Sequence, residues 1–290
     1  MGRISRTFEL AGSSWRVLKA DKELILLPVM SLIATIAVAV SFLIPLLDSC
    51  TADTGGGTAS CELATTDYVL LGMMYVALAF ITIFFNAALV YAANQRMSGG
   101  DPTVGSALRG AALRVHRIFP WALVSATVSV ILRAIEERAG VFGRIIAGIA
   151  GIAWALVTFL VIPVLVIEDV GVREAVKRSG AMFKRTWGEN VAAQVGFGLL
   201  GFLLVLPAIA VIAFGFGTGG VTAVVLVAAG VAWILLVSLV LAALSGVFQT
   251  ALYHFAAGTG TTGFPAATLE AAFAPKRGGG NLRVPRGFAG

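Results

Sequence analysis

The chain has 290 residues, of which 58% are hydrophobic and only 12% are Asp, Glu, Lys or Arg. Soluble domains carry about a quarter charged residues, so this composition excludes an ordinary soluble globular protein and indicates an integral membrane protein. The formal net charge of +6 could attract nucleic acid, but the basic residues stand close to apolar segments and form no recognisable nucleic-acid-binding module. We therefore expect membrane lipids, anionic ones in particular, as partners and no nucleic acid.

Six apolar segments are long enough to cross a hydrocarbon core of about 30 Å as helices. They lie at 24–47, 68–92, 119–135, 145–167, 191–215 and 221–248. Helix is the expected conformation, because an unpaired backbone finds no hydrogen-bond partner in lipid and the segments lack the alternation of a membrane β-barrel. The sequence thus predicts an all-α polytopic membrane protein with six transmembrane helices.

Lys and Arg residues gather in every second connection between these segments. With six spans, 18 of the 21 would lie on one side, and only Arg133, Arg138 and Arg144 would lie on the other. The positive-inside rule then places both termini in the cytoplasm. A cleaved signal peptide ending near AVA at 37–39 is the alternative for the first span, but the apolar run continues to Leu47, which is too long for a signal-peptide core.

The stretch at 172–187, VREAVKRSGAMFKRTW, is more basic than its surroundings. At 100° per residue, one arc of a helix would hold Val172, Ala175, Val176, Ser179, Met182, Phe183, Thr186 and Trp187, and the opposite arc Arg173, Lys177, Arg178, Lys184 and Arg185. This division predicts an amphipathic helix in the headgroup plane, started by a capping Asp169. A solvated loop would explain the charges but leaves the apolar arc without a reason.

A similar pattern recurs twice. Residues 101–119 match at an offset of 68, and the N-terminus matches residues 104–115 at an offset of 100. We therefore expect three tandem units at about 1–92, 101–167 and 169–256, each a cytoplasmic interfacial helix followed by a transmembrane hairpin. They would form one membrane domain over 1–275, followed by a disordered tail at 276–290. The expected headgroup contacts are Arg109, Arg117, Lys177, Arg178, Lys184 and Arg185, and the expected interfacial anchors are Trp15, Phe119, Phe183 and Trp187.

Three longer segments carry a family resemblance: FELAGSSWRVLKADKELILLP, NQRMSGGDPTVGSALRGA and IPVLVIEDVGVREAVKRSGAMFKRTWGEN. Together they resemble an uncharacterised prokaryotic family of six-span membrane proteins, similar to the membrane domain that accompanies some glycerophosphodiester phosphodiesterases. The resemblance covers about residues 1–275 and implies a helical fold in a prokaryotic cell membrane and contact with lipid. The catalytic phosphodiesterase domain has no counterpart in this chain, so the resemblance implies no activity.

Residues with catalytic chemistry are sparse. His116 and His254 have no carboxylate or cysteine at metal-ligand spacing, and Glu168 and Asp169 would diverge by 100° on a helix. The glycine pattern GTGTTG at 258–263 matches the dinucleotide fingerprint but follows an apolar helix, where no βαβ unit can form. We expect no catalytic residue, no metal site and no cofactor.

Other polar residues favour structural roles. Cys50 and Cys61 bracket a Gly-rich loop on the extracytoplasmic side, which favours a disulfide over two free thiols. The amides of Asn86, Gln194 and Gln249 lie in or near spans, where hydrogen bonds between helices are favoured over substrate binding. We expect the prolines at 28, 45, 163 and 207 to kink spans one, four and five.

Three function classes follow. The first is a non-enzymatic protein that binds or organises lipid, or scaffolds a membrane assembly with a second copy or another membrane protein, through its basic helices. The second is a lipid or small-hydrophobe transporter, for which the proline kinks are the only direct hint. The third is a membrane-embedded enzyme, which would need polar side chains that converge only in space.

Overall fold

The computed structural model describes residues 23–51, 65–138, 140–185 and 187–258. Within these ranges the chain is helical and no strand occurs. The helices are α2 (Glu23–Thr51), α3 (Thr65–Met97), α4 (Val104–Ala112), α5 (Val115–Arg138), α6 (Gly140–Thr158), α7 (Val161–Ile167), α8 (Val172–Arg185), α9 (Trp187–Thr218) and α10 (Gly220–Ala257). The all-α prediction is confirmed.

Six helical segments are long and apolar enough to cross a membrane. They are α2, α3, α5, α6 taken together with α7, α9 from Gly198 onward, and α10. Each coincides with one of the six apolar segments found in the sequence, so six candidate spans are confirmed. The predicted helices before α2, the loop between α2 and α3, and the predicted tail lie outside the described residues.

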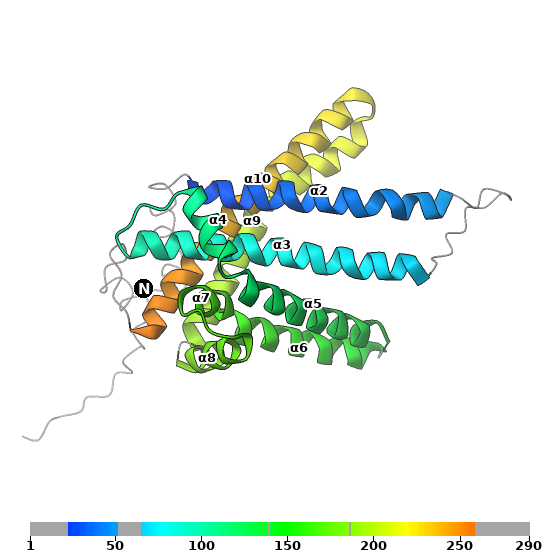
Figure 1. Ribbon diagram of the computed structural model, residues 1–290. Coiled ribbons are helices and arrows are strands. Elements are labelled where there is room, and N and C mark those ends of the chain that lie inside the picture. Colours follow the sequence, from blue (N-terminus) through cyan, green and yellow to red (C-terminus); the bar gives the residue numbers. More distant parts are fainter. Residues whose placement is uncertain (1–22, 52–64, 139, 186, 259–290) are drawn as a thin grey trace, which may run out of the picture.

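The candidate spans pair as three antiparallel hairpins, α2–α3, α5–α6 and α9–α10 (Figure 1). The first two run side by side across the view, and the third leaves them at a wide angle. All three converge on α4, α7 and α8. We call the buried assembly of α4, α7 and α8 with the adjoining ends of α2, α3, α5 and α10 the junction, and the opposite ends of the hairpins the hairpin tips.

The hydrophobic core lies in the junction. The last turns of α3 and α10 pack together there, and five residues of the seven-residue α7 are buried among them. Small residues bring the backbones close: a side chain at Gly110 would overlap the ring of Tyr91, and one at Gly246 would overlap Leu89. Close backbone approach of this kind is a common way for helices to associate where lipid removes the hydrophobic driving force.

The helix starts at 101–119 differ from the sequence-based expectation. Asp101 pairs with Arg96 at 3.3 Å, and Thr103 caps α4 through reciprocal bonds with Ser106. Helix α4 ends at Ala112, and residues from Val115 onward already belong to α5. The continuous interfacial helix predicted over 101–119 is therefore wrong, because a turn at 113–114 redirects the chain into the third span.

The prolines act unequally. Helix α2 continues through Pro28 and Pro45, and α9 continues through Pro207. The fourth span, in contrast, is interrupted between Thr158 and Val161, four residues upstream of Pro163. Of the expected proline effects, the interruption of span four is the one that shapes the junction.

Candidate functional site

The interruption of span four exposes backbone groups that other elements satisfy. A proline has no N–H, so Pro163 cannot bond the carbonyl of Phe159 one turn before it. The side-chain amide of Gln249, on α10, donates a hydrogen bond to that carbonyl. A buried carbonyl without a hydrogen bond would cost about 1–3 kcal/mol, so Gln249 serves as a tertiary partner for the broken helix.

Ser179 on α8 satisfies the rest of the interruption. Its hydroxyl donates to the carbonyl of Val157, and the amide of Leu160 donates to the same hydroxyl at 3.2 Å. The residue is fully buried. Ser179 was grouped with the apolar arc of 172–187 in the sequence, and the hydrogen bonds explain why a polar residue stands there. In the sequence, Pro163 was the signal that span four would be interrupted and that its backbone would need a partner such as Ser179.

A carboxylate network lies beside this contact. The hydroxyl of Tyr253 donates to Glu168 Oε1 at 2.9 Å, and the guanidinium of Arg178 binds the other oxygen of Glu168. Arg178 Nε also donates to Glu174 Oε1 at 2.9 Å. This last hydrogen bond lowers the pKa of Glu174 below its ordinary value. The network ties the end of span four and α8 to α10.

Two further polar contacts cross the junction. His254 Nε2 lies 2.8 Å from the Oδ1 of Asn94, which joins α10 to α3. Asp169 Oδ1 lies 3.7 Å from Arg117 Nε, which joins the α7–α8 turn to α5. Asp169 has a φ of +51°, a conformation that Asp tolerates better than most residues. Asp169, which was expected to cap α8, forms an ion pair with α5.

The predicted headgroup cations divide into two groups. Arg109 and Lys177 form no salt bridge within the described ranges, whereas Arg117 and Arg178 form salt bridges with carboxylates, although Arg178 is exposed as well. Arg117 also lies on α5 and not on an interfacial helix. The side chains of Lys184 and Arg185 are outside the described residues. The sequence could not identify the partner of Arg117, because Asp169 lies far along the chain, whereas Glu174 stands one turn before Arg178 on the same helix.

The predicted aromatic anchors take other positions. Phe183 is buried, with 9% of its surface exposed, so little of its ring is left to anchor in lipid. Phe119 lies on α5, half exposed, with its ring 5.7 Å from that of Phe80. Trp15 and the side chain of Trp187 lie outside the described residues.

Of the amides and cysteines named in the sequence analysis, the structure describes the side chains of two, Gln249 and Asn86. Gln249 takes part in the interhelical bond described above, whereas the Oδ1 of Asn86 is buried on α3 without a hydrogen-bond partner. The side chain of Gln194 and the pairing of Cys50 with Cys61 lie outside the described residues. In the part of the chain that the structure describes, no group of three His, Cys, Asp or Glu side chains could hold a metal ion.

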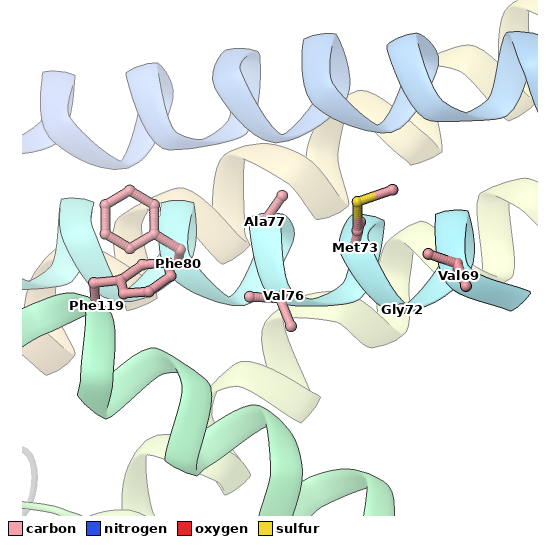
Figure 2. A pocket seen from close by; sticks show the side chains of 7 residues that line it. All are labelled: Val69, Gly72, Met73, Val76, Ala77, Phe80 and Phe119. Carbon is pink, nitrogen blue, oxygen red and sulfur yellow. The ribbon is translucent and has the colours of Figure 1, made fainter.

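A groove of about 650 Å³ follows α3 away from the junction (Figure 2). It is lined by Val69, Gly72, Met73, Val76, Ala77, Phe80 and Phe119. Figure 2 shows the rings of Phe80 and Phe119 together at one end and Val69 at the other. Every lining side chain is apolar, so the groove suits a hydrocarbon chain and offers no polar group to fix a headgroup.

Residues 65–264 match DUF6159, a family of unknown function. The match covers more than half of the chain. The chain belongs to this family. Its matched region runs from α3 to beyond α10 and contains the interruption of span four, Ser179 and Gln249. No curated protein and no solved structure matches the chain.

Proposed function

We propose that this member of the family is a non-enzymatic membrane protein that binds anionic lipid headgroups along the outer surface of the junction. In this role it organises lipid or holds a membrane assembly together. The observation that carries the proposal is the position of α8, which lies across the ends of α6 and α7 (Figure 1). Ala175 and Ser179 are buried beneath it, and Arg173 and Lys177 are exposed on it.

This arrangement supports an interfacial, amphipathic role for α8. A helix at the end of a hairpin bundle, crosswise to the hairpins, would lie in the headgroup plane of a membrane that the hairpins cross. The junction would then face the cytoplasm, since the hairpin tips carry few Lys and Arg residues. The three-unit repeat and the resemblance to a phosphodiesterase-associated membrane domain are parts of the same proposal, and both imply contact with lipid.

The charges that would attract lipid are Arg109, Arg173 and Lys177. All three are exposed, and none forms a salt bridge within the ranges that the structure describes. A basic residue near an anionic membrane surface contributes about 1 kcal/mol, so three would contribute about 3 kcal/mol together. Arg117 and Arg178 would contribute less, because carboxylates already neutralise them.

The polar residues of the junction support a structural role over catalysis. Ser179 and Gln249 bind backbone groups of the interrupted span. Glu168 is occupied by Tyr253 and Arg178. Side chains committed to such contacts are poorly placed to act as a general base or a nucleophile, which also need access to a substrate.

A lipid or small-hydrophobe transporter is the second candidate. The apolar groove along α3 favours it, because the groove is open at the side of the bundle and reaches from Phe119 toward the hairpin tips. Transport would require a second conformation in which this groove connects to the other side of the membrane. Binding of lipid without transport requires only the conformation described above.

The test replaces Arg109, Arg173 and Lys177 together by Gln in the full chain. The protein is reconstituted with spin-labelled phosphatidylglycerol or phosphatidylcholine, and the relative association of the two lipids is measured by electron spin resonance. We expect the preference for the anionic lipid to fall by up to about one hundredfold, the equivalent of about 3 kcal/mol.

The matched control keeps the charges and changes the side chains: Arg109→Lys, Arg173→Lys and Lys177→Arg. It should retain the wild-type preference, since a diffuse electrostatic attraction depends on charge more than on geometry. An unchanged preference in the Gln variant would overturn the proposal. A loss in both variants would also contradict it, because specific side-chain geometry and not charge would then be responsible.

A further inference from the structure

A second groove lies between α5 and α6, close to the hairpin tips and far from the cations of the junction. Its volume is about 820 Å³. The residues that matter are Arg133 and Glu136 on α5, and Arg144, Gly148, Gly151 and Trp154 on α6. The groove has a charged mouth and an apolar floor, a combination that the groove along α3 lacks.

The floor is open because glycine lines it. A Cβ added at Gly148 would meet nothing within 4 Å, and one at Gly151 would meet only Leu132, at 3.9 Å. Trp154 closes the inner end and stacks on Trp121, with ring centroids 5.9 Å apart. The space above the glycines is therefore left unfilled by the protein's own side chains.

The length of the groove matches one leaflet. Arg144, Gly148, Gly151 and Trp154 follow helical spacing and share one face of α6. The ten helical steps from Arg144 to Trp154 span about 15 Å at the rise of an α-helix. That is about half of a 30 Å hydrocarbon core, so the groove would extend from the headgroup region to the middle of the bilayer.

The charges at the mouth balance. Arg133 is paired with Glu137 at 3.1 Å, whereas Arg144 and Glu136 form no salt bridge within the described ranges. One cation and one anion thus remain for a ligand. A zwitterionic headgroup carries a phosphate and an amine and complements both, whereas an anionic headgroup would leave Glu136 opposed by like charge.

We propose that the groove between α5 and α6 binds one zwitterionic glycerophospholipid of the leaflet at the hairpin tips. Its phosphate lies at Arg144, its amine at Glu136, and one acyl chain runs over Gly148 and Gly151 to Trp154. This site is distinct from the anionic-lipid surface of the junction, since the two share no residue and lie at opposite ends of the hairpins.

The test measures retained lipid by native mass spectrometry. The full chain is delipidated in detergent and exposed to equal amounts of phosphatidylethanolamine and phosphatidylglycerol. We expect one retained phosphatidylethanolamine per chain. Gly148→Leu fills the floor and should reduce retention by about tenfold, which corresponds to the loss of about two buried methylene contacts. Glu136→Gln and Arg144→Gln should each abolish the preference for the zwitterionic lipid.

The matched control is Gly198→Leu, since Gly198 is an exposed glycine of α9 whose added side chain would also meet open space. This control should retain the lipid as the wild type does. A second readout is quenching of tryptophan fluorescence by phosphatidylethanolamine with a brominated acyl chain. Quenching should weaken in Gly148→Leu and in Trp154→Phe.

Three outcomes would overturn the proposal. The first is equal retention of lipid by wild type and Gly148→Leu. The second is equal retention of the two lipids by the wild type. The third is a change in oligomeric state of Gly148→Leu with unchanged lipid retention, which would assign the groove to helix docking. All of these measurements, including those of the wild-type groove, are made with Arg109, Arg173 and Lys177 replaced by Gln, so phosphatidylglycerol retained at the junction does not enter the comparison and the two proposals are tested separately.

Discussion

At the junction, Ala93 of α3 and Val247 of α10 are completely buried, whereas at the hairpin tips Phe142 and Phe216 leave 81% and 76% of their surface uncovered. The tip residues belong to α6 and α9, the partners of α5 and α10 in their hairpins. The difference teaches that protein covers the apolar side chains at the junction and leaves those of the hairpin tips uncovered, as expected for helices long and apolar enough to cross a membrane.

Hydrogen bonding divides in the same way. The hydroxyls of Ser41 and Thr127, away from the junction, bond carbonyls one turn earlier in their own helices. Ser179 and Gln249 instead bond backbone groups of a different helix. Ser41 and Thr127 are thus satisfied within their own helices, whereas Ser179 and Gln249 hold different helices together. Substitutions should therefore act differently at the two ends.

The largest difference is expected for glycine. A side chain at Gly246 would overlap Leu89, whereas one at Gly72 would meet nothing within 4 Å. We expect Gly246→Val to lower the free energy of unfolding by about 3 kcal/mol through overpacking, and Gly72→Val to change it by less than about 0.5 kcal/mol. Unfolding by sodium dodecyl sulfate in mixed micelles measures both. Equal effects would show that the two ends are packed alike.

A smaller difference is expected for serine. Ser179→Ala leaves the carbonyl of Val157 and the amide of Leu160 without their tertiary partner, so we expect a loss of about 2 kcal/mol. Ser41→Ala removes only a bond within α2 and should change stability by less than about 0.5 kcal/mol. Unfolding by sodium dodecyl sulfate in mixed micelles measures the stability of both variants. If Ser179→Ala is as mild as Ser41→Ala, the interruption of span four does not depend on α8.

The smallest effect is expected on acidification. Because the bond from Arg178 lowers the pKa of Glu174 in the folded state, this carboxylate stabilises α8 above its unfolded pKa, about 4.3, and the contribution is lost as pH falls through the lower folded value. Amide hydrogen exchange in α8 should quicken over this range, after correction for intrinsic exchange. Glu174→Gln should remove this pH dependence, and the exchange of α10 provides the internal reference. A response that persists in Glu174→Gln would assign it to another group.

Much of the fold follows from local sequence. The six spans were predictable because hydropathy over about 20 residues decides whether a helix is stable in lipid, and that property does not depend on neighbouring helices. The break near Pro163 was predictable as a kink, because proline lacks the N–H that bonds the preceding turn whatever the surrounding helices are. The predicted helix over 101–119 failed, because a turn of two residues after Ala112 leaves no strong mark in hydropathy.

The candidate site was less predictable. Phe183 stood on the apolar arc of 172–187, and apolar periodicity cannot tell a ring that faces lipid from one that faces protein. Arg178 and Lys177 are adjacent and chemically alike, yet only Arg178 forms salt bridges, with Glu168 and Glu174. The hydroxyl of Tyr253, which also binds Glu168, becomes a neighbour only when α10 returns to the junction.

The sequence by itself determined that this chain is helical, that it has six segments able to cross a membrane, and that its basic residues favour one end, because composition and spacing act over one or two turns. Only the tertiary structure decided which cations are neutralised, where the interrupted span finds its hydrogen bonds, and which grooves stay open. Those outcomes depend on contacts between residues up to 90 positions apart, such as Gln249 with Phe159, and local pattern carries no record of them.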